Sequence, residues 1–255
     1  MKMNLHTHTW RCNHARGMEE PYIAAALAQG FDILGFADHT PWFFPGEYYS
    51  NFRMRPELLA NYCDTVRSLA KQYARQIQIP LGLELEFYPD LLPQMLPVLQ
   101  DQGVEYLLLG QHFPGNEMGE HYVGAPTADE SILKRYCAQA ADAMQTGLFT
   151  YFAHPDLMYY TGEDAIYRRY MRQLCREAKS CNMALEVNVL GKWAGRNYPD
   201  RRFWELAAEE GCSAVLGWDA HAPEHLQQPE AEQALRDMLR QLGIPLLDTV
   251  ELRKF

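Results

Sequence analysis

The sequence predicts a single α/β domain, spanning residues 1–255, in which seven parallel strands form a (β/α)7 barrel. Strand-like and helix-like segments alternate along the whole chain, and regular alternation of this kind implies a parallel sheet. Six of the seven strand-like segments end in histidine, aspartate or glutamate. Only a closed sheet brings so many strand ends around one centre, and that C-terminal face is where barrels carry their active sites.

The expected strands are short apolar runs bounded by turn residues. Leu107–Leu109 and Ala214–Leu216 are apolar at every position, which is typical of parallel strands covered on both faces. The seven expected strands cover residues 3–7, 31–37, 78–84, 104–110, 149–153, 183–189 and 213–218. Residues 244–250 are expected to add a terminal strand beside the first.

The segments between the strands carry apolar residues at helical spacing, shown most clearly between Leu58 and Tyr73. Pro56 suits a first helical turn, and glycine follows five of these segments, where a left-handed cap is needed. The expected helices cover residues 18–29, 56–75, 91–101, 129–146, 163–180, 200–210 and 229–242. The longest irregular segments, 40–55, 113–128 and 190–199, follow strand ends and are expected to roof a pocket.

Composition excludes several classes of protein. The chain carries 33 acidic and 23 basic residues, and a net charge of −10 argues against an extended nucleic-acid partner. No apolar run approaches the ~18 residues of a membrane span. A proposed ligand lies within six residues of Met1, which leaves no room for a cleaved signal peptide. The six cysteines form no CxxC pair, so free thiols and a cytoplasmic location are expected. The oligomeric state is left open.

Nine residues at or near the strand ends are candidate metal ligands. Imidazole nitrogen and carboxylate oxygen are ligands that first-row divalent metals share. A lone histidine is more often a core or surface residue, but the repetition of this pattern across separate segments favours a metal site. The nine candidates are His6, His8, His14, His39, Glu84, His112, His154, Asp219 and His221. They are too many for one ion and suit two or three, bridged by a carboxylate.

These residues lie in motifs that resemble the PHP (polymerase and histidinol phosphatase) superfamily, specifically its histidinol-phosphatase-like branch. The opening motif spans residues 6–17, and later motifs lie at 35–41, 82–84, 153–156, 186–188 and 219–221. The resemblance covers nearly the whole chain. It implies a distorted (β/α)7 barrel with a trinuclear metal centre at the C-terminal ends of the strands.

The resemblance also implies how the ligands divide among the ions. One metal takes His6, His8, Glu84 and Asp219; a second shares Glu84 and adds His112 and His154; a third takes His14, His39 and His221. The metal can be zinc, iron or manganese, all of which accept nitrogen and oxygen ligands. Gln111 and Trp218 depart from the pattern of the branch, as does the loop after His112, and these departures leave the substrate open.

The activity that this resemblance implies is hydrolysis of a small phosphorylated metabolite, histidinol phosphate or a related phosphate monoester, by a metal-activated hydroxide. Glu84, Asp219 and His221 are the candidate catalytic residues. The sixth strand ends without a metal ligand, which leaves its loop free for the substrate. The candidate substrate-binding residues are Arg16, Asn188, Lys192 and Arg196.

Other charged residues receive weaker expectations. Asp38 and Asp156 each neighbour a ligand histidine and are expected either to orient its imidazole or to cap a helix. Glu86 shares strand parity with Glu84, and its role is left open between an outer-sphere and a catalytic one. Arg53 and Arg55 are expected to be solvated loop residues.

Three other functions remain as alternatives. The first is a phosphodiesterase or exonuclease acting on nucleotides, which the acidic charge disfavours. The second is a non-catalytic, metal-stabilised module, which the complete ligand set disfavours. The third is an amidohydrolase-type enzyme, which also opens with an HxH motif but fits the closing Asp-x-His less well.

Overall fold

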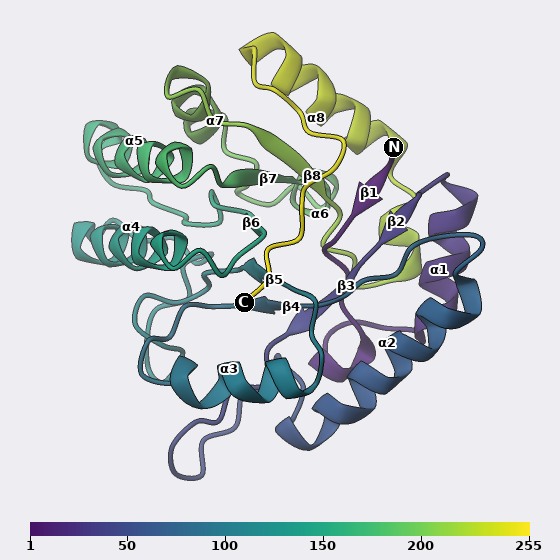
Figure 1. Cartoon of the computed structure of the whole chain (residues 1–255). Helices are drawn as coiled ribbons and strands as arrows, with labels where there is room; N and C mark the ends of the chain where they lie inside the picture. Colours follow the sequence, from purple (N-terminus) through teal and green to yellow (C-terminus); the bar gives the residue numbers. More distant parts are fainter.

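The computed structural model describes all 255 residues and confirms the predicted α/β fold class, a curled parallel sheet surrounded by helices (Figure 1). The strands are β1 (Met3–Asn4), β2 (Ile33–Leu34), β3 (Phe36–His39), β4 (Leu81–Leu85), β5 (Tyr106–Leu109), β6 (Tyr151–Phe152), β7 (Ala184–Asn188) and β8 (Ala214–Gly217). Every pair of neighbours is parallel. Strands β2 and β3 are two pieces of one predicted strand, interrupted at Gly35, so the seven expected positions are all filled.

The sheet closes through the residues that follow β1. Thr7 forms a parallel bridge with Ala220, and the His8 amide donates to the Ala220 carbonyl at 2.9 Å. On the other side, the Ala37 amide of β3 donates to the Thr7 carbonyl at 2.8 Å. The segment that continues β1 therefore lies between β3 and the end of β8. Its two histidines, His6 and His8, face the ends of both neighbouring strands.

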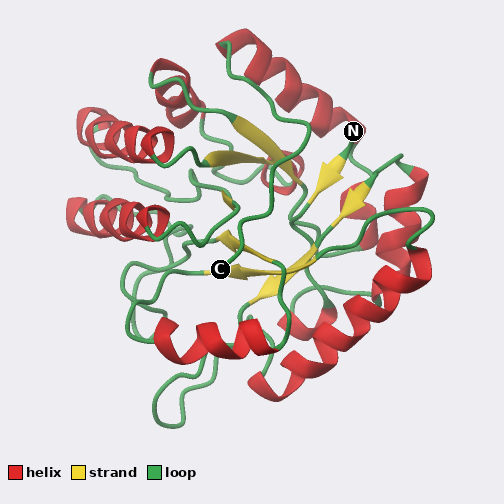
Figure 2. Cartoon of the chain, in the orientation of Figure 1, coloured by secondary structure: helices red, strands yellow, loops and turns green.

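The helices form the outer layer (Figure 2). They are α1 (Glu19–Ala28), α2 (Leu59–Tyr73), α3 (Leu92–Asp101), α4 (Glu130–Gln145), α5 (Asp164–Ser180), α6 (Val189–Trp193), α7 (Arg201–Glu209) and α8 (Pro229–Leu242). Local sequence sets several of their ends. Asp129 accepts from the Ser131 amide at 2.8 Å at the start of α4, and Gly243 adopts a φ of 71° after α8.

Two apolar clusters hold these layers together. Nine buried residues from alternate strand positions, including Leu5, Tyr106 and Val215, fill the interior of the barrel. Sixty buried residues form the layer between the sheet and the helices. Inside the barrel, the Tyr106 hydroxyl donates to the Leu5 carbonyl at 2.7 Å, and the interior therefore has no space for a side chain at Gly35. The core lies below the strand ends and leaves them free to carry polar groups.

The prediction of a terminal strand beside the first was wrong. Leu246 instead forms a parallel bridge with Ala214 at the start of β8, and the Leu247 amide donates to the Ala214 carbonyl at 2.8 Å. The chain then crosses the N-terminal end of the barrel (Figure 1), where Val250 and Leu252 pack against the interior cluster. Covering this apolar end is the physical reason for the path of the tail.

No helix in the structure combines the length and the apolar character needed to span a lipid bilayer.

Candidate metal centre

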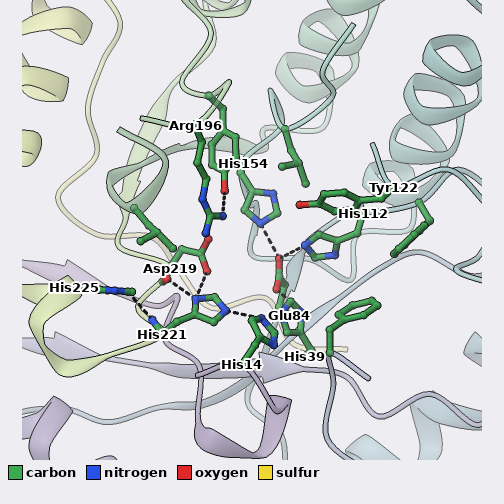
Figure 3. Close-up of a pocket in the computed structure, with 15 residues that line it drawn as sticks. His14, His39, Glu84, His112, Tyr122, His154, Arg196, Asp219, His221 and His225 are labelled. Atoms are coloured by element: carbon green, nitrogen blue, oxygen red, sulfur yellow. Dashed lines mark hydrogen bonds and ion pairs between the residues drawn. The ribbon is translucent and has the colours of Figure 1, made fainter. Parts of the chain in front are cut away.

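The structure brings all nine predicted ligands together at the C-terminal ends of the strands, and Figure 3 shows the seven that line a cavity there. They surround the floor of a cavity of about 490 Å³. Seven of them line the cavity: His14, His39, Glu84, His112, His154, Asp219 and His221. His6 and His8 lie beneath the floor and are fully buried. Residues spread over more than 200 positions of sequence thus form one cluster.

Glu84 lies at the centre of this cluster. Its carboxylate oxygens face five imidazoles, with nearest nitrogens at 2.9 Å for His39 and His154, 3.4 Å for His112, and 3.6 Å for His6 and His8. Both oxygens are buried and neither has a hydrogen-bond partner. An ionised carboxylate in such a place loses its hydration, and only nearby positive charge compensates for that loss. Glu84 is therefore placed where its two oxygens could bind cations held by the surrounding histidines.

Two of the groups in which ligand atoms lie close together contain the residues that the family resemblance assigns to the first and third ions, whereas two others, His6 with Glu84 and His154 and His8 with His39 and Glu84, cross that division. His6, His8 and Asp219 offer ligand atoms within 4.8 Å of one another, as do His14, His39 and His221. Asp219 Oδ1 lies 3.0 Å from His8 Nε2, and the Nε2 atoms of His14 and His221 are 2.9 Å apart.

Two observations show that these residues fit divalent metal ions. The donor set is nitrogen and oxygen throughout, as zinc, iron and manganese accept. Buried nitrogens of His6, His8 and His39 have no hydrogen-bond partner within the protein. Cys12 lies close enough to His8 and His221 to join them, but burial raises the pKa of its thiol, and a neutral thiol is a poor ligand.

Burial and neighbouring charges shift the pKa values of the cluster's side chains in both directions. Burial lowers the pKa of His39 to about 3 and that of His221 well below its ordinary value, so both imidazoles are neutral. Burial alone would raise the pKa of Glu84, but the surrounding histidines, His112 foremost, hold it well below its usual range. Neighbouring carboxylates outweigh burial at three other rings: the pKa values of His6 and His112 are raised, and Asp219 and Asp38 raise the pKa of His8 to about 9. A bound cation would compete for the lone pair of that imidazole.

Oxygen atoms behind the histidines fix the orientation of most rings. His6 Nδ1 lies 2.7 Å from Glu186, and His112 Nδ1 lies 2.8 Å from Glu86. Backbone carbonyl oxygens orient the rings of His14 and His221 in the same way, and each oxygen lies 2.8 Å from the Nδ1 atom of its ring. A ring that donates from Nδ1 presents the lone pair of Nε2 to a metal.

The carboxylates with open roles are now placed. Glu86 lies behind the ring of His112. Of the two roles left open for Glu86, this position fits the outer-sphere one. Asp38 lies 3.5 Å from His8 Nδ1 without a hydrogen bond to it, and accepts from the Thr9 amide and hydroxyl, so it holds the turn that follows His8. Asp156 accepts from Trp204 Nε1 at 2.9 Å and from the Asp200 amide at 2.7 Å, and therefore holds the start of α7 instead of orienting a ligand.

Two ligand positions adopt backbone conformations that side chains rarely take. His154 has a φ of 34° and Asp219 a φ of 47°. Left-handed backbone at a residue other than glycine costs about 1–2 kcal/mol. Strain of this kind concentrates at functional sites. Gly110, which directly follows β5, leaves space for the Glu84 carboxylate of the neighbouring strand β4. A Cβ atom at Gly110 would overlap that carboxylate.

The predicted substrate-binding residues have different surroundings. Arg196 lines the cavity and donates to the Tyr198 hydroxyl at 2.7 Å. Lys192 is exposed on α6 and does not line the cavity, and the exposed Arg16 pairs with Glu224 outside it. Of the three candidate substrate-binding cations, Arg196 alone therefore lines the cavity.

Asn188 was expected to face the substrate, and the structure gives it other contacts. Its amide nitrogen donates to Glu186 at 2.7 Å and to Asp219 at 3.3 Å. Its side-chain oxygen accepts from the Gly191 amide at 2.7 Å and caps α6. Asn188 is fully buried and holds two carboxylates of the centre in place.

Sequence reasoning missed three residues of the site. Glu186 shares strand parity with Asn188, which was the signal available for it. His225 follows the last strand four residues after His221, lines the cavity, and accepts from the His221 amide at 3.1 Å. Arg53 was expected to be solvated, but its side chain is buried against Glu86 and Glu117, whereas the exposed Arg55 stacks on Tyr49.

Comparison with known proteins agrees with this geometry. The PHP domain family matches residues 4–189. A probable histidinol-phosphatase of Deinococcus radiodurans is 30% identical over 227 residues, covering 86% of this chain and 85% of the relative. A histidinol-phosphatase of Bacillus subtilis is 24% identical, and the match covers 86% of this chain and 93% of the relative. The fold matches a histidinol phosphate phosphatase from Lactococcus lactis, solved with zinc, L-histidinol and phosphate, at a TM-score of 0.76, 18% identity and 98% coverage of both chains.

The chain therefore belongs to the PHP domain family. The expectation of an enzyme of the metal-dependent phosphoesterase class, similar to the histidinol phosphatases, is confirmed.

Proposed function

We propose that the protein hydrolyses a small-molecule phosphate monoester and that histidinol phosphate is the first substrate to test. The observation that carries this proposal is the buried Glu84 carboxylate, which faces five imidazoles without a hydrogen bond. Bound divalent ions would neutralise a phosphate dianion and lower the pKa of a coordinated water. The names of the relatives supply the candidate substrate.

The chain's own residues have defined roles in this proposal. The three ligand groups described above would hold two or three zinc, iron or manganese ions, with Glu84 as the bridge. Arg196 faces the same cavity and would contact the phosphoryl oxygens, since a guanidinium pairs with phosphate through parallel hydrogen bonds. The apolar residues Phe52, Phe113, Leu157 and Leu190 line the cavity and would surround the organic part of the substrate.

The shape and charge of the site favour a monoester over the phosphodiesterase alternative. The cavity of about 490 Å³ has the size of pockets that bind metabolites. Arg196 is the only lysine or arginine among its fifteen lining residues, whereas binding an extended polynucleotide requires a row of cations. A cytoplasmic location remains a prediction that fits six free cysteines.

The proposed activity is tested by steady-state kinetics of the metal-loaded protein. Histidinol phosphate and p-nitrophenyl phosphate are compared with bis(p-nitrophenyl) phosphate. We expect kcat/KM for the monoesters to exceed that for the diester by at least about tenfold. Faster diester hydrolysis would support the phosphodiesterase alternative, and no hydrolysis of any ester would support a non-catalytic module.

Replacing Arg196 by alanine is expected to reduce kcat/KM for a phosphate monoester. The loss of one charge-assisted hydrogen bond corresponds to about 1.5–3 kcal/mol, or roughly 10–150-fold. Metal content should not change, because the guanidinium contacts Tyr198 and no predicted ligand. Lys192→Ala is the matched control, since Lys192 is exposed on α6, does not line the cavity, and its variant should stay within twofold of wild type. Equal kinetics for both variants would place the phosphate contact elsewhere.

A further inference from the structure

A buried ion cluster lies directly behind the predicted ligand His112. It consists of Arg53, Glu86 and Glu117, whose exposed fractions are 1%, 0% and 5%. The Arg53 guanidinium contacts both oxygens of Glu86, at 2.9 and 3.1 Å, and donates twice to Glu117 Oε2. One buried cation thus pairs with two buried carboxylates, and neither carboxylate has another arginine or lysine within ion-pair distance.

The cluster reaches the metal centre through one imidazole. Glu86 Oε1 lies 2.8 Å from His112 Nδ1, and on the far side of the ring Nε2 lies 3.4 Å from Glu84 Oε1. Figure 3 shows His112 directed toward Glu84. Glu86 therefore orients the ring, and Arg53 with Trp42 holds Glu86, since Trp42 Nε1 donates to it at 3.1 Å.

The same guanidinium joins the two segments that roof the cavity. Arg53 belongs to the segment 40–55 and also donates to the Thr40 carbonyl at 2.9 Å, whereas Glu117 belongs to the segment 113–128. The first segment supplies Phe52 to the cavity lining and the second supplies Phe113 and Tyr122, and the ring centroids of Phe52 and Phe113 are 5.9 Å apart. The Arg53 guanidinium carbon lies 4.4 Å from the centroid of Phe52.

We propose that Arg53 is a positioning residue that couples the aromatic roof of the cavity to the metal ligand His112. Through Glu86 it fixes the ring that binds metal, and through Glu117 it holds the two roof segments together. Its effect on substrate binding rests on the proposed phosphatase function, but its effect on metal binding does not. A merely structural ion cluster would change the thermal stability without changing metal affinity or KM.

The central test compares Arg53→Met with Arg55→Met. Arg55 is the matched control because it belongs to the same segment, is exposed, and stacks on Tyr49 away from the cluster. Metal affinity is measured by competition between the protein and a chelator for zinc, and KM with p-nitrophenyl phosphate. We expect Arg53→Met to bind one metal equivalent about 10–100-fold more weakly, as for other residues that orient metal ligands, and to raise KM. Arg55→Met should match wild type in both measurements.

Two milder variants separate the two connections and serve if Arg53→Met does not fold. Glu117→Gln weakens only the link between the roof segments, so KM should rise while zinc affinity stays unchanged. Arg53→Lys keeps the charge but cannot make the paired contacts, so full metal content with a raised KM is expected. Wild-type zinc affinity and KM in Arg53→Met, or wild-type KM in both milder variants, would overturn the proposal. If the wild-type protein hydrolyses no ester, the proposed function fails, but the zinc affinity of Arg53→Met compared with that of Arg55→Met still decides the link to His112. If Arg53→Met is unfolded, the zinc affinity of Glu86→Gln is compared with that of Glu205→Gln, a control at the surface of α7. Equal zinc affinities in either comparison would overturn the link.

Discussion

Glu84→Gln is expected to reduce kcat by at least about a hundredfold, which corresponds to roughly 2.7 kcal/mol in the barrier. The glutamine side chain has the same size but no negative charge, so it cannot hold two cations together. The fold should survive, because the Glu84 oxygens make no hydrogen bond that the barrel depends on. The measurement is kcat with a phosphate monoester after metal reconstitution, together with the Tm of the metal-free protein.

Glu205→Gln provides the matched control for this variant. This substitution also removes one negative charge, but from the surface of α7, where Glu205 pairs with Arg168 and Arg201. Surface pairs contribute about 0–1 kcal/mol, so its activity should equal that of wild type. If Glu84→Gln kept more than about a tenth of the wild-type kcat, Glu84 would not be the bridge.

Metal removal is expected to abolish activity and to lower the Tm by roughly 10 °C. Metals that bind only the folded protein stabilise it by about 4 kcal/mol when they are present at a thousand times their dissociation constant. For a chain of this size, each kcal/mol shifts the Tm by about 2–4 °C. The metal-free protein should nevertheless stay folded, since both apolar clusters lie below the centre. Activity and calorimetry before and after dialysis against a chelator check this prediction.

Restoring the metal provides the control for this experiment. Adding back zinc, iron or manganese separately should recover both the activity and the Tm, and the most effective ion identifies the preferred metal. Unchanged activity and Tm after removal, with the loss of metal verified, would contradict a role of the ions in catalysis and stability.

The convergence of the nine candidate ligands was predictable because the barrel converts a local pattern into a spatial one. His39, His112 and His154 each end an apolar strand, and the ends of parallel strands meet at one face whatever their separation in sequence. The strand positions were predictable for a similar reason, since continuous apolar runs are required where both faces are covered.

The residues that escaped prediction act through contacts that have no periodic signal. Arg53 lies in an irregular segment, and nothing local shows that Glu86 and Glu117 will bury it. Asn188 ends a strand as the ligands do, but its hydrogen bonds to Glu186 and Asp219 depend on how β7 and β8 lie side by side. The tail was misplaced because an apolar run does not reveal whether it pairs with the first strand or with β8.

The central claim is that this chain holds a multinuclear metal centre, and elemental analysis tests it most directly. Protein purified without chelator, and a second sample reconstituted with zinc, iron or manganese, are measured by mass spectrometry against protein concentration. The nine converging ligands and the bridging position of Glu84 predict at least two equivalents per chain. One equivalent or less after reconstitution would contradict the account.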